Sequence, residues 1–353
     1  MSHRFLIKEI ALQAGVGTAT VDRVLNGRVH VREHMRRRVE HAIRELEQQQ
    51  YQLASAGRKL VVDVVVEAPQ RFADEIRDAL EADVADLQPA VFRLRYLTRE
   101  IMTTSEVVEA LHAIARRGSH GVLLKARDEP EIVQAIALLE QRGIPVITIF
   151  TDIPGSPRLA YAGLDNTIAG ATAAYLVGKW LGRRAGHVLV TMSHERFYGE
   201  EQRLQSFRRV LAERFPHLSL IDASGGQGLD TQTEEHVRTA IGNAKIAAVY
   251  SMGGGNVAIV RALRGLRQKP ACFIGHDLDR DNVGLLRDGA IDAILHHDLR
   301  QDMRCACHQI MHFHKLLPRA AVEQSSSVVV VTPENIPQQI ESRLSGRTRR
   351  AGE

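Results

Sequence analysis

Residues 7–27 read IKEIALQAGVGTATVDRVLNG, and this stretch decides how the N-terminus folds. Apolar side chains recur at helical spacing before Gly15 and again over residues 18–25, so the pattern predicts two short helices around a tight glycine turn. A third amphipathic helix is predicted over residues 32–49. Two helices joined by a short turn and backed by a third are typical of a helix-turn-helix domain, whose second helix enters the major groove of DNA.

The positive charge of the chain is concentrated in the same region. The protein has a formal net charge of +4, yet residues 1–60 hold 11 Lys and Arg against 6 Asp and Glu, and the rest holds 35 against 36. A small basic segment of this kind suits contact with DNA phosphates. The alternatives are a solvated basic face and a three-helix module with a structural or protein-binding role.

Residues 7–51, IKEIALQAGVGTATVDRVLNGRVHVREHMRRRVEHAIRELEQQQY, resemble the headpiece of the LacI/GalR family, whose outline is A-x-x-A-G-V-S-x-x-T-V-S-R-V-L-N. The resemblance implies that Thr18, Ala19 and Arg23 lie on the base-reading side of the second helix. It further implies a packing or backbone contact for Thr20, and a phosphate or capping position for Asn26. We therefore expect a DNA-binding headpiece over residues 1–50.

Two positions depart from that family pattern. Gly17 replaces the usual Ser cap, which should weaken the start of the second helix by a few tenths of a kcal/mol. Asp22 replaces another Ser, so it either accepts a hydrogen bond from a cytosine amino group or pairs with Arg23.

Residues 51–60 are expected to form the hinge between headpiece and sensor. In the family this segment folds on the operator and inserts a leucine into the minor groove, which makes Leu60 the best-aligned wedge and Leu53 an open alternative. Arg58 and Lys59 would contact phosphates in either register. The segment lacks the usual Pro and contains Gly57, which costs a helix roughly 1 kcal/mol.

Beyond residue 60, apolar strands alternate with amphipathic helices, which predicts parallel sheets covered on both faces. Strands are expected at 60–66, 91–97, 121–124, 146–150, 188–192, 218–223, 247–252, 272–275 and 293–295. Helices are expected at 72–87, 105–116, 130–142, 169–181 and 201–215. A Pro/Gly-rich break at 154–157, after which the pattern restarts, favours two lobes over one large sheet.

The segments 163–174 (GLDNTIAGATAA), 275–292 (GHDLDRDNVGLLRDGAID) and 328–332 resemble the type I periplasmic-binding-protein fold, which the LacI/GalR family uses as its sensor. The expected fold class is α/β, with a three-helix headpiece and a two-lobed sensor. We place lobe one at about 61–163 and 298–327, and lobe two at about 164–297 and 328–343. The basic tail, 344–353, is expected to be disordered.

A small-molecule effector is expected between the lobes, because ligands of open α/β sheets bind at the carboxyl ends of the strands. The strand ends suggest these candidates: Gln70, Phe72, Thr151, Asp152, Arg203, Asn256, Asp277 and His297. Carboxylate, guanidinium and aromatic groups suit a sugar or polyol, and the family resemblance assigns ligand contacts to Arg203, Asp277 and His297. Two structural alternatives stay open: Asp277 caps the next helix, and Arg203 lies on a solvated helix face.

No cofactor, metal site or catalytic set is expected. The glycine string at 251–256 lacks the spacing of a nucleotide-binding loop, and no nucleophile elbow or H-E-x-x-H string occurs. Cys305, His308 and His312 share one helical face, but surface or interface histidines explain them better than a metal does. The three cysteines and the lack of an apolar N-terminal segment suggest a cytoplasmic protein without a membrane span.

The sequence thus predicts a homodimeric repressor, rather than an activator, that binds palindromic double-stranded DNA and responds to a carbohydrate-like effector. Two-fold symmetry follows because one headpiece reads about half of a palindromic site. The alternatives are a solute-binding protein and a cytoplasmic sugar-processing α/β enzyme.

Overall fold

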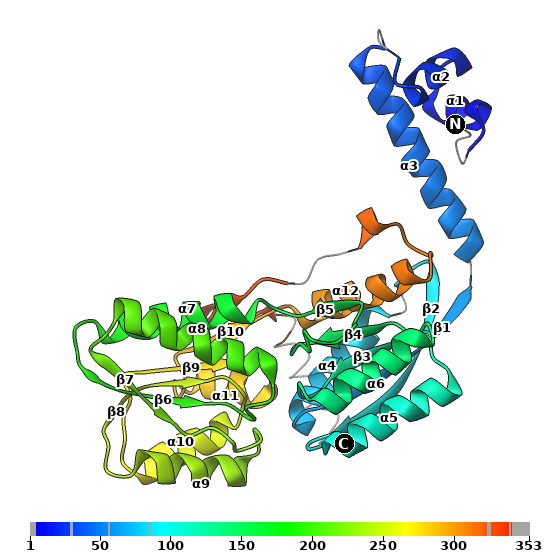
Figure 1. Ribbon diagram of the computed structural model, residues 1–353. Coiled ribbons are helices and arrows are strands. Elements are labelled where there is room, and N and C mark those ends of the chain that lie inside the picture. Colours follow the sequence, from blue (N-terminus) through cyan, green and yellow to red (C-terminus); the bar gives the residue numbers. More distant parts are fainter. Residues whose placement is uncertain are drawn as a thin grey trace, which may run out of the picture.

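The computed structural model describes residues 5–28, 31–55, 57–84, 86–322, 326–338 and 340, without the side chains of 47–55. The N-terminal part is a bundle of α1 (Ile7–Ala14), α2 (Thr18–Leu25) and α3 (Glu33–Ser55), which stands apart from the two lobes (Figure 1). Gly15 ends α1 with a φ of 60°, and the side chains that hold the bundle together include Ile10, Val21 and Val39. The three-helix headpiece is confirmed.

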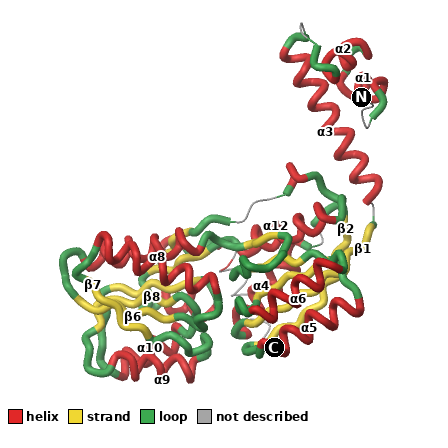
Figure 2. The backbone as a smooth tube through the Cα atoms, in the orientation of Figure 1, coloured by secondary structure: helices red, strands yellow, loops and turns green. Residues whose placement is uncertain are grey.

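Lobe one is built on a parallel sheet with the strand order β2-β1-β3-β4-β5. Its strands are β1 (Arg58–Glu67), β2 (Ala90–Arg99), β3 (Gly121–Lys125), β4 (Val146–Ile149) and β5 (Ala160–Ala162). Its helices are α4 (Gln70–Asp83), α5 (Thr104–Arg117), α6 (Pro130–Gln141) and α12 (Leu299–Phe313), which cover both faces of the sheet (Figure 2).

Lobe two has the order β11-β10-β9-β8-β6-β7, in which β11 alone runs antiparallel to its neighbour. Its strands are β6 (Gly186–Thr191), β7 (Leu218–Asp222), β8 (Ile246–Ser251), β9 (Cys272–His276), β10 (Ala293–His296) and β11 (Val329–Val331). Its helices are α7 (Asn166–Leu181), α8 (Tyr198–Arg214), α9 (Asp230–Ile241), α10 (Asn256–Gly265) and α11 (Arg280–Arg287). Two short 3-10 turns, Arg319–Ala321 and Pro333–Asn335, flank the last strand.

Three crossovers join the lobes. The chain passes from β5 to α7, back from β10 to α12, and again towards β11. Every strand expected from the apolar pattern is present within two residues of its expected ends. That pattern did not predict β5 or β11, but β11 falls in 328–332, which the family resemblance had singled out. The two-lobed parallel α/β architecture is confirmed, and none of the described helices combines the length and apolar character that a membrane crossing requires.

Residues 51–60, which we expected to form a separate hinge, belong largely to a helix and a strand in the structure. Helix α3 continues to Ser55 through the first half of the predicted hinge, and β1 already begins at Arg58. Leu60 has no exposed surface and packs in the core of lobe one, so its assignment as a minor-groove wedge is wrong: a core leucine cannot enter DNA while its lobe stays folded. The side chain of Leu53 and the tail 344–353 lie outside the described residues.

Candidate functional site

Helix α2 presents most of the predicted DNA-contacting residues to solvent. Thr18, Ala19, Arg23 and Asn26 are exposed, whereas Thr20 is half-buried. Arg58 and Lys59 are exposed at the start of β1, after the headpiece. These placements leave the side chains accessible to DNA, and their individual DNA contacts remain predictions.

The partners of Asp22 lie just after the C-terminal end of α2. Its carboxylate accepts a hydrogen bond from Asn26 Nδ2 at 2.8 Å, and its ion-pair partner within the described headpiece is Arg28, at 4.0 Å, rather than Arg23. Asn26 follows α2 as its C-cap residue. Arg23 is thus left available for another partner.

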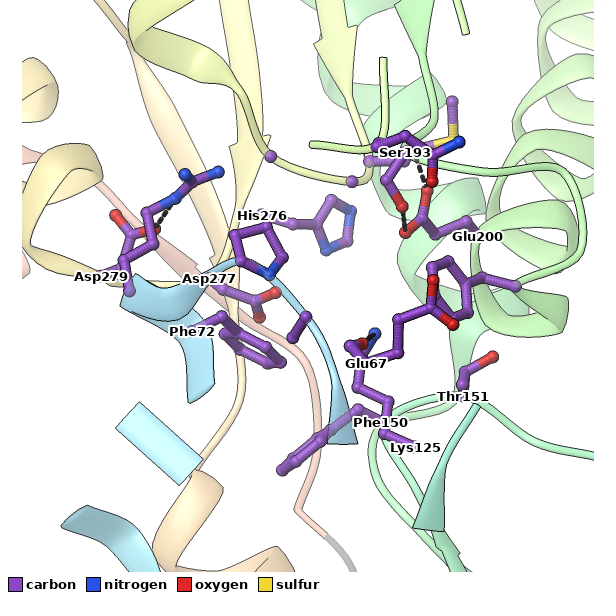
Figure 3. Close-up of a pocket in the computed structure, with 18 of the residues that line it drawn as sticks. Glu67, Phe72, Lys125, Phe150, Thr151, Ser193, Glu200, His276, Asp277 and Asp279 are labelled. Atoms are coloured by element: carbon purple, nitrogen blue, oxygen red, sulfur yellow. Dashed lines mark hydrogen bonds and ion pairs between the residues drawn. The ribbon is translucent and has the colours of Figure 1, made fainter. Parts of the chain in front are cut away.

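A pocket lies between the two lobes at the carboxyl ends of the strands (Figure 3). Its lining encloses about 780 Å³, part of it open to solvent. Five of the eight predicted effector residues line it: Phe72, Thr151, Arg203, Asp277 and His297.

The other three predicted residues do not line the pocket. Gln70 opens α4 and donates from Nε2 to Asp74 at 2.7 Å. Asp152 is committed to an ion pair with Arg158. Asn256 opens α10 and donates to Asn282 at 2.8 Å. They follow strands as expected, but their side chains bond to other protein groups and do not line the pocket.

Asp277 is presented by a strained turn after β9. Its φ of 62° lies in the left-handed region, which costs a non-glycine residue about 1–3 kcal/mol and is typical of functional sites. Burial alone would raise the pKa of its carboxyl, but the hydrogen bond and charge of His297 outweigh burial and hold the pKa below its usual range. The cap of α11 is Asp279, which accepts from the Asn282 backbone, so the capping alternative for Asp277 is wrong.

Arg203 is buried and fixed rather than solvated. Its Nε donates to Asn166 Oδ1 at 2.7 Å and its Nη1 donates to the Met252 carbonyl at 2.8 Å. Both contacts come from lobe two, so the guanidinium is oriented before any ligand enters.

The sequence interpretation missed several polar pocket residues, among them Glu67, Lys125, Ser193 and Glu200. Glu67 ends β1 and pairs with Arg127; Lys125 ends β3 and donates to the Glu67 carbonyl at 2.8 Å. In lobe two, Glu200 accepts hydrogen bonds from the backbone and hydroxyl of Ser193, at 2.6 and 2.5 Å. Burial raises the pKa of Glu200 and lowers that of Lys125. The available signal was their position: Glu67 and Lys125 are the last residues of their strands.

Aromatic rings form the lobe-one wall of the pocket. Phe72 and Phe150 meet edge to face with ring centroids 5.4 Å apart, and Phe150 lies 5.5 Å from His297. Phe150 and Gln227, like Asp277, have positive φ values, 62° and 55°. Three strained non-glycine residues therefore line one pocket.

Arg71 of α4 crosses from lobe one to lobe two. Its Nε lies 3.0 Å from Asp279 Oδ2, and its Nη2 donates to the Gly228 carbonyl at 2.8 Å. Gly254 admits this guanidinium, since a Cβ there would lie 2.8 Å from Nη2. As Arg71 also lines the pocket, this contact spans the cleft beside the ligand space.

Over the described part of the chain, no group of three or more His, Cys, Asp or Glu side chains could hold a metal ion. The pocket is lined by carboxylates, cations and aromatic rings.

Comparisons with known proteins agree with this architecture. The model of bacterial regulatory proteins of the lacI family matches residues 6–49, and that of the periplasmic binding protein domain matches residues 63–311. Both are families of binding proteins rather than enzymes. A search of curated proteins found no match.

Solved structures share the fold at low identity. GanP, a glucose-galactose binding protein from Geobacillus stearothermophilus, has a TM-score of 0.70 and 18% identity over 79% of this chain and 99% of its own. A solute binding protein from Burkholderia graminis C4D1M in complex with D-arabinose has a TM-score of 0.70 and 21% identity, over 79% and 97%. A Bacteroides fragilis structure described as a LacI transcriptional regulator has a TM-score of 0.68 and 15% identity, over 80% and 99%.

At these identities the structural matches establish the fold alone, whereas one of the two family matches lies on the headpiece and the other on the lobes. The chain therefore belongs to the LacI family of bacterial regulatory proteins, with a DNA-binding helix-turn-helix followed by a domain of the periplasmic-binding-protein type.

Proposed function

We propose that the protein is a homodimeric, cytoplasmic repressor whose affinity for a palindromic operator is controlled by an uncharged sugar or polyol bound between the lobes. The effector changes how the lobes sit on one another, and this alters the spacing of the two headpieces. By linkage, DNA and effector then change each other's affinity by the same factor.

One observation carries the effector class. Within the described residues, Glu67 Oε2 of lobe one is buried without a hydrogen-bond partner, Asp277 Oδ1 of lobe two has only a long contact, 3.4 Å, with His297 Nε2, and both residues line the pocket. Unmet carboxylate oxygens are costly, so they favour a ligand that brings hydroxyl donors to both lobes at once. Phe72 and Phe150 supply an apolar surface for the carbon skeleton.

The charges of the pocket argue against an ionic ligand. Glu67 is paired with Arg127, Asp279 with Arg71, and Asp277 with His297. Because these three carboxylates are paired inside the protein, they offer a ligand hydrogen-bond acceptors rather than unpaired negative charge. The sugars that GanP and the Burkholderia protein bind are consistent with this ligand class.

Dimerisation and the repressor role rest on the DNA-binding mode. A single α2 reaches few base pairs, and a second headpiece related by two-fold symmetry supplies the other half-site. A solute-binding protein would have no use for the basic headpiece, and the two families that the chain matches are binding proteins rather than enzymes.

The test is a thermal-shift screen of pentoses, hexoses and polyols, followed by gel shifts of a palindromic operator and of random DNA. A sugar that raises Tm and changes operator affinity supports the proposal. Sugar binding without any preference for the operator would favour the solute-binding alternative, and turnover of the sugar would favour the enzyme.

A further inference from the structure

A buried carboxylate, Asp302, sits where α12 enters lobe one. The side chain has no exposed surface. Its Oδ1 accepts from the Ser326 backbone N–H at 2.7 Å, and both its oxygens lie 3.0 Å from the Ser326 hydroxyl. Its Oδ2 accepts from His297 Nδ1 at 2.5 Å.

These two partners belong to different crossovers. His297 directly follows β10, on the segment that returns the chain to lobe one, and Ser326 lies on the segment that leads to β11 in lobe two. Asp302 thus ties together two of the three connections between the lobes.

The same imidazole also reaches the pocket. His297 Nε2 lies 3.4 Å from Asp277 Oδ1, and the ring packs 5.5 Å from Phe150. A continuous line of polar contacts therefore runs from Ser326 through Asp302 and His297 to Asp277, from the crossovers to the ligand space.

We propose that Asp302 is a positioning residue that orients the His297 imidazole towards Asp277 and couples the pocket to two of the crossovers. The inference rests on the effector site proposed above, and it adds the residue that connects a ligand in that site to the crossovers between the lobes. An effector hydroxyl that binds Asp277 changes the contact between Asp277 and the His297 imidazole. Because Asp302 binds the same imidazole and Ser326, this change is passed on to the crossovers.

The geometry also dictates the charge of the ring. An imidazole that faces a carboxylate at each nitrogen donates from both only when it carries two protons. Burial lowers the pKa of His297, but the hydrogen bonds and charges of Asp277 and Asp302 outweigh burial and raise it to about 9.

Other ionisable groups around the ring do not replace this pair. Burial lowers the pKa of His276 well below its usual value and raises that of Tyr161, so both stay neutral near pH 7. Arg203 is fixed by lobe-two contacts, and the His296 ring lies 6.0 Å from that of His297. Without the charge of Asp302, Asp277 would be the main group that raises the pKa of His297 against the lowering effect of burial.

The experiment follows the ring of His297 by NMR in the full-length protein, with histidines carrying ¹³C at Cε1 and with His297→Gln identifying the signal. We expect wild-type His297 to stay protonated up to pH 8. In Asp302→Asn the midpoint should fall by at least one pH unit, into the neutral range, while Asp298→Asn should behave as wild type. Asp298 makes a good control because it caps the same helix and is exposed.

Hydrogen exchange of the segment 326–331 tests the coupling to the crossovers. Exchange should become faster in Asp302→Asn and remain unchanged in Asp298→Asn. An unchanged His297 midpoint or unchanged exchange in Asp302→Asn would overturn the proposal. If that variant fails to fold, the NMR titration of the wild-type protein is the test, and a His297 midpoint at or below pH 7 contradicts the proposal. Neither readout uses DNA or sugar, so its failure is separable from failure of the proposed function.

Discussion

Arg71 of lobe one and Asp279 of lobe two form an ion pair across the pocket, with Nε and Oδ2 3.0 Å apart. The pair is mostly shielded, because Arg71 is 22% exposed and Asp279 7%. Asp279 also caps α11, so the guanidinium of one lobe is anchored to a rigid helix end of the other. We call Arg71 a latch because its contacts with Asp279 and Gly228 join the two lobes.

Replacing Arg71 should therefore open the cleft. In Arg71→Ala, small-angle X-ray scattering should give a larger radius of gyration, and sugar should dissociate several-fold faster, since two cross-lobe contacts are lost. Arg77→Ala is the control, because Arg77 stacks on Tyr96 within lobe one. Equal scattering and equal dissociation rates for Arg71→Ala and wild type would contradict the latch.

Asp277→Asn and Glu67→Gln should each weaken sugar binding by about 10- to 100-fold, the range for losing a charged acceptor of a hydrogen bond. Isothermal titration with the sugar that gives the largest thermal shift measures the loss. Asp281→Asn, on the outer turn of α11 beside Arg280, should bind as wild type does. Unimpaired binding in both pocket variants would place the effector elsewhere.

Arg23→Ala should reduce operator affinity by about 1–3 kcal/mol and relax base preference within the half-site, because one good side chain–base contact carries that much discrimination. Arg209→Ala removes the same charge from an exposed position on α8 and should leave binding unchanged. Anisotropy titrations with operator and with singly substituted half-sites make the comparison. A loss equal on operator and random DNA would show that Arg23 contacts only phosphate.

The stability of the sensor should depend on pH through His297. Its folded pKa of about 9 lies above the ordinary value of 6.5, so its stabilising contribution is complete below pH 6.5 and is lost as the pH rises through 9. That contribution is on the order of 3 kcal/mol. The Tm gap between wild type and His297→Gln should thus shrink from pH 6 to pH 9.5. His217→Gln, on the surface, should give no such trend, and a constant gap for His297→Gln would refute the assignment.

Leu60→Ala should destabilise lobe one by about 2–5 kcal/mol, the usual cost of truncating a core leucine. Denaturant unfolding measures it, with Val91→Ala, on the half-exposed edge strand, as a mild comparison. At temperatures where the variant stays folded, operator bending should be unaffected. Normal stability together with lost bending would restore the wedge assignment.

Most of the fold was predictable because its signals are local. The spacing of apolar residues placed the three helices of the headpiece and nearly every strand, and β5 escaped because a three-residue strand carries too little pattern. The error at Leu60 is instructive: the residue opens the apolar run LVVDVVV, whose strand pattern conflicted with the wedge role taken from the family resemblance. The local pattern was the better guide.

The site was predictable only in part. Arg203, Asp277 and His297 were named correctly as pocket residues, but their partners come from distant parts of the chain. Asp302 is one polar residue in an amphipathic helix until the fold brings Ser326 and His297 to it. Long-range contacts of this kind leave no periodic trace in the sequence.

The central claim is that pocket and operator are linked. Its most direct test is one operator-binding titration, by fluorescence anisotropy, with and without the saturating sugar identified by thermal shift, for wild type and Asp277→Asn. We predict that the sugar changes the operator Kd of wild type by at least fivefold, whereas Asp277→Asn binds operator as wild type does and ignores the same sugar concentration. An operator Kd in wild type that does not change when the sugar is bound would contradict the account.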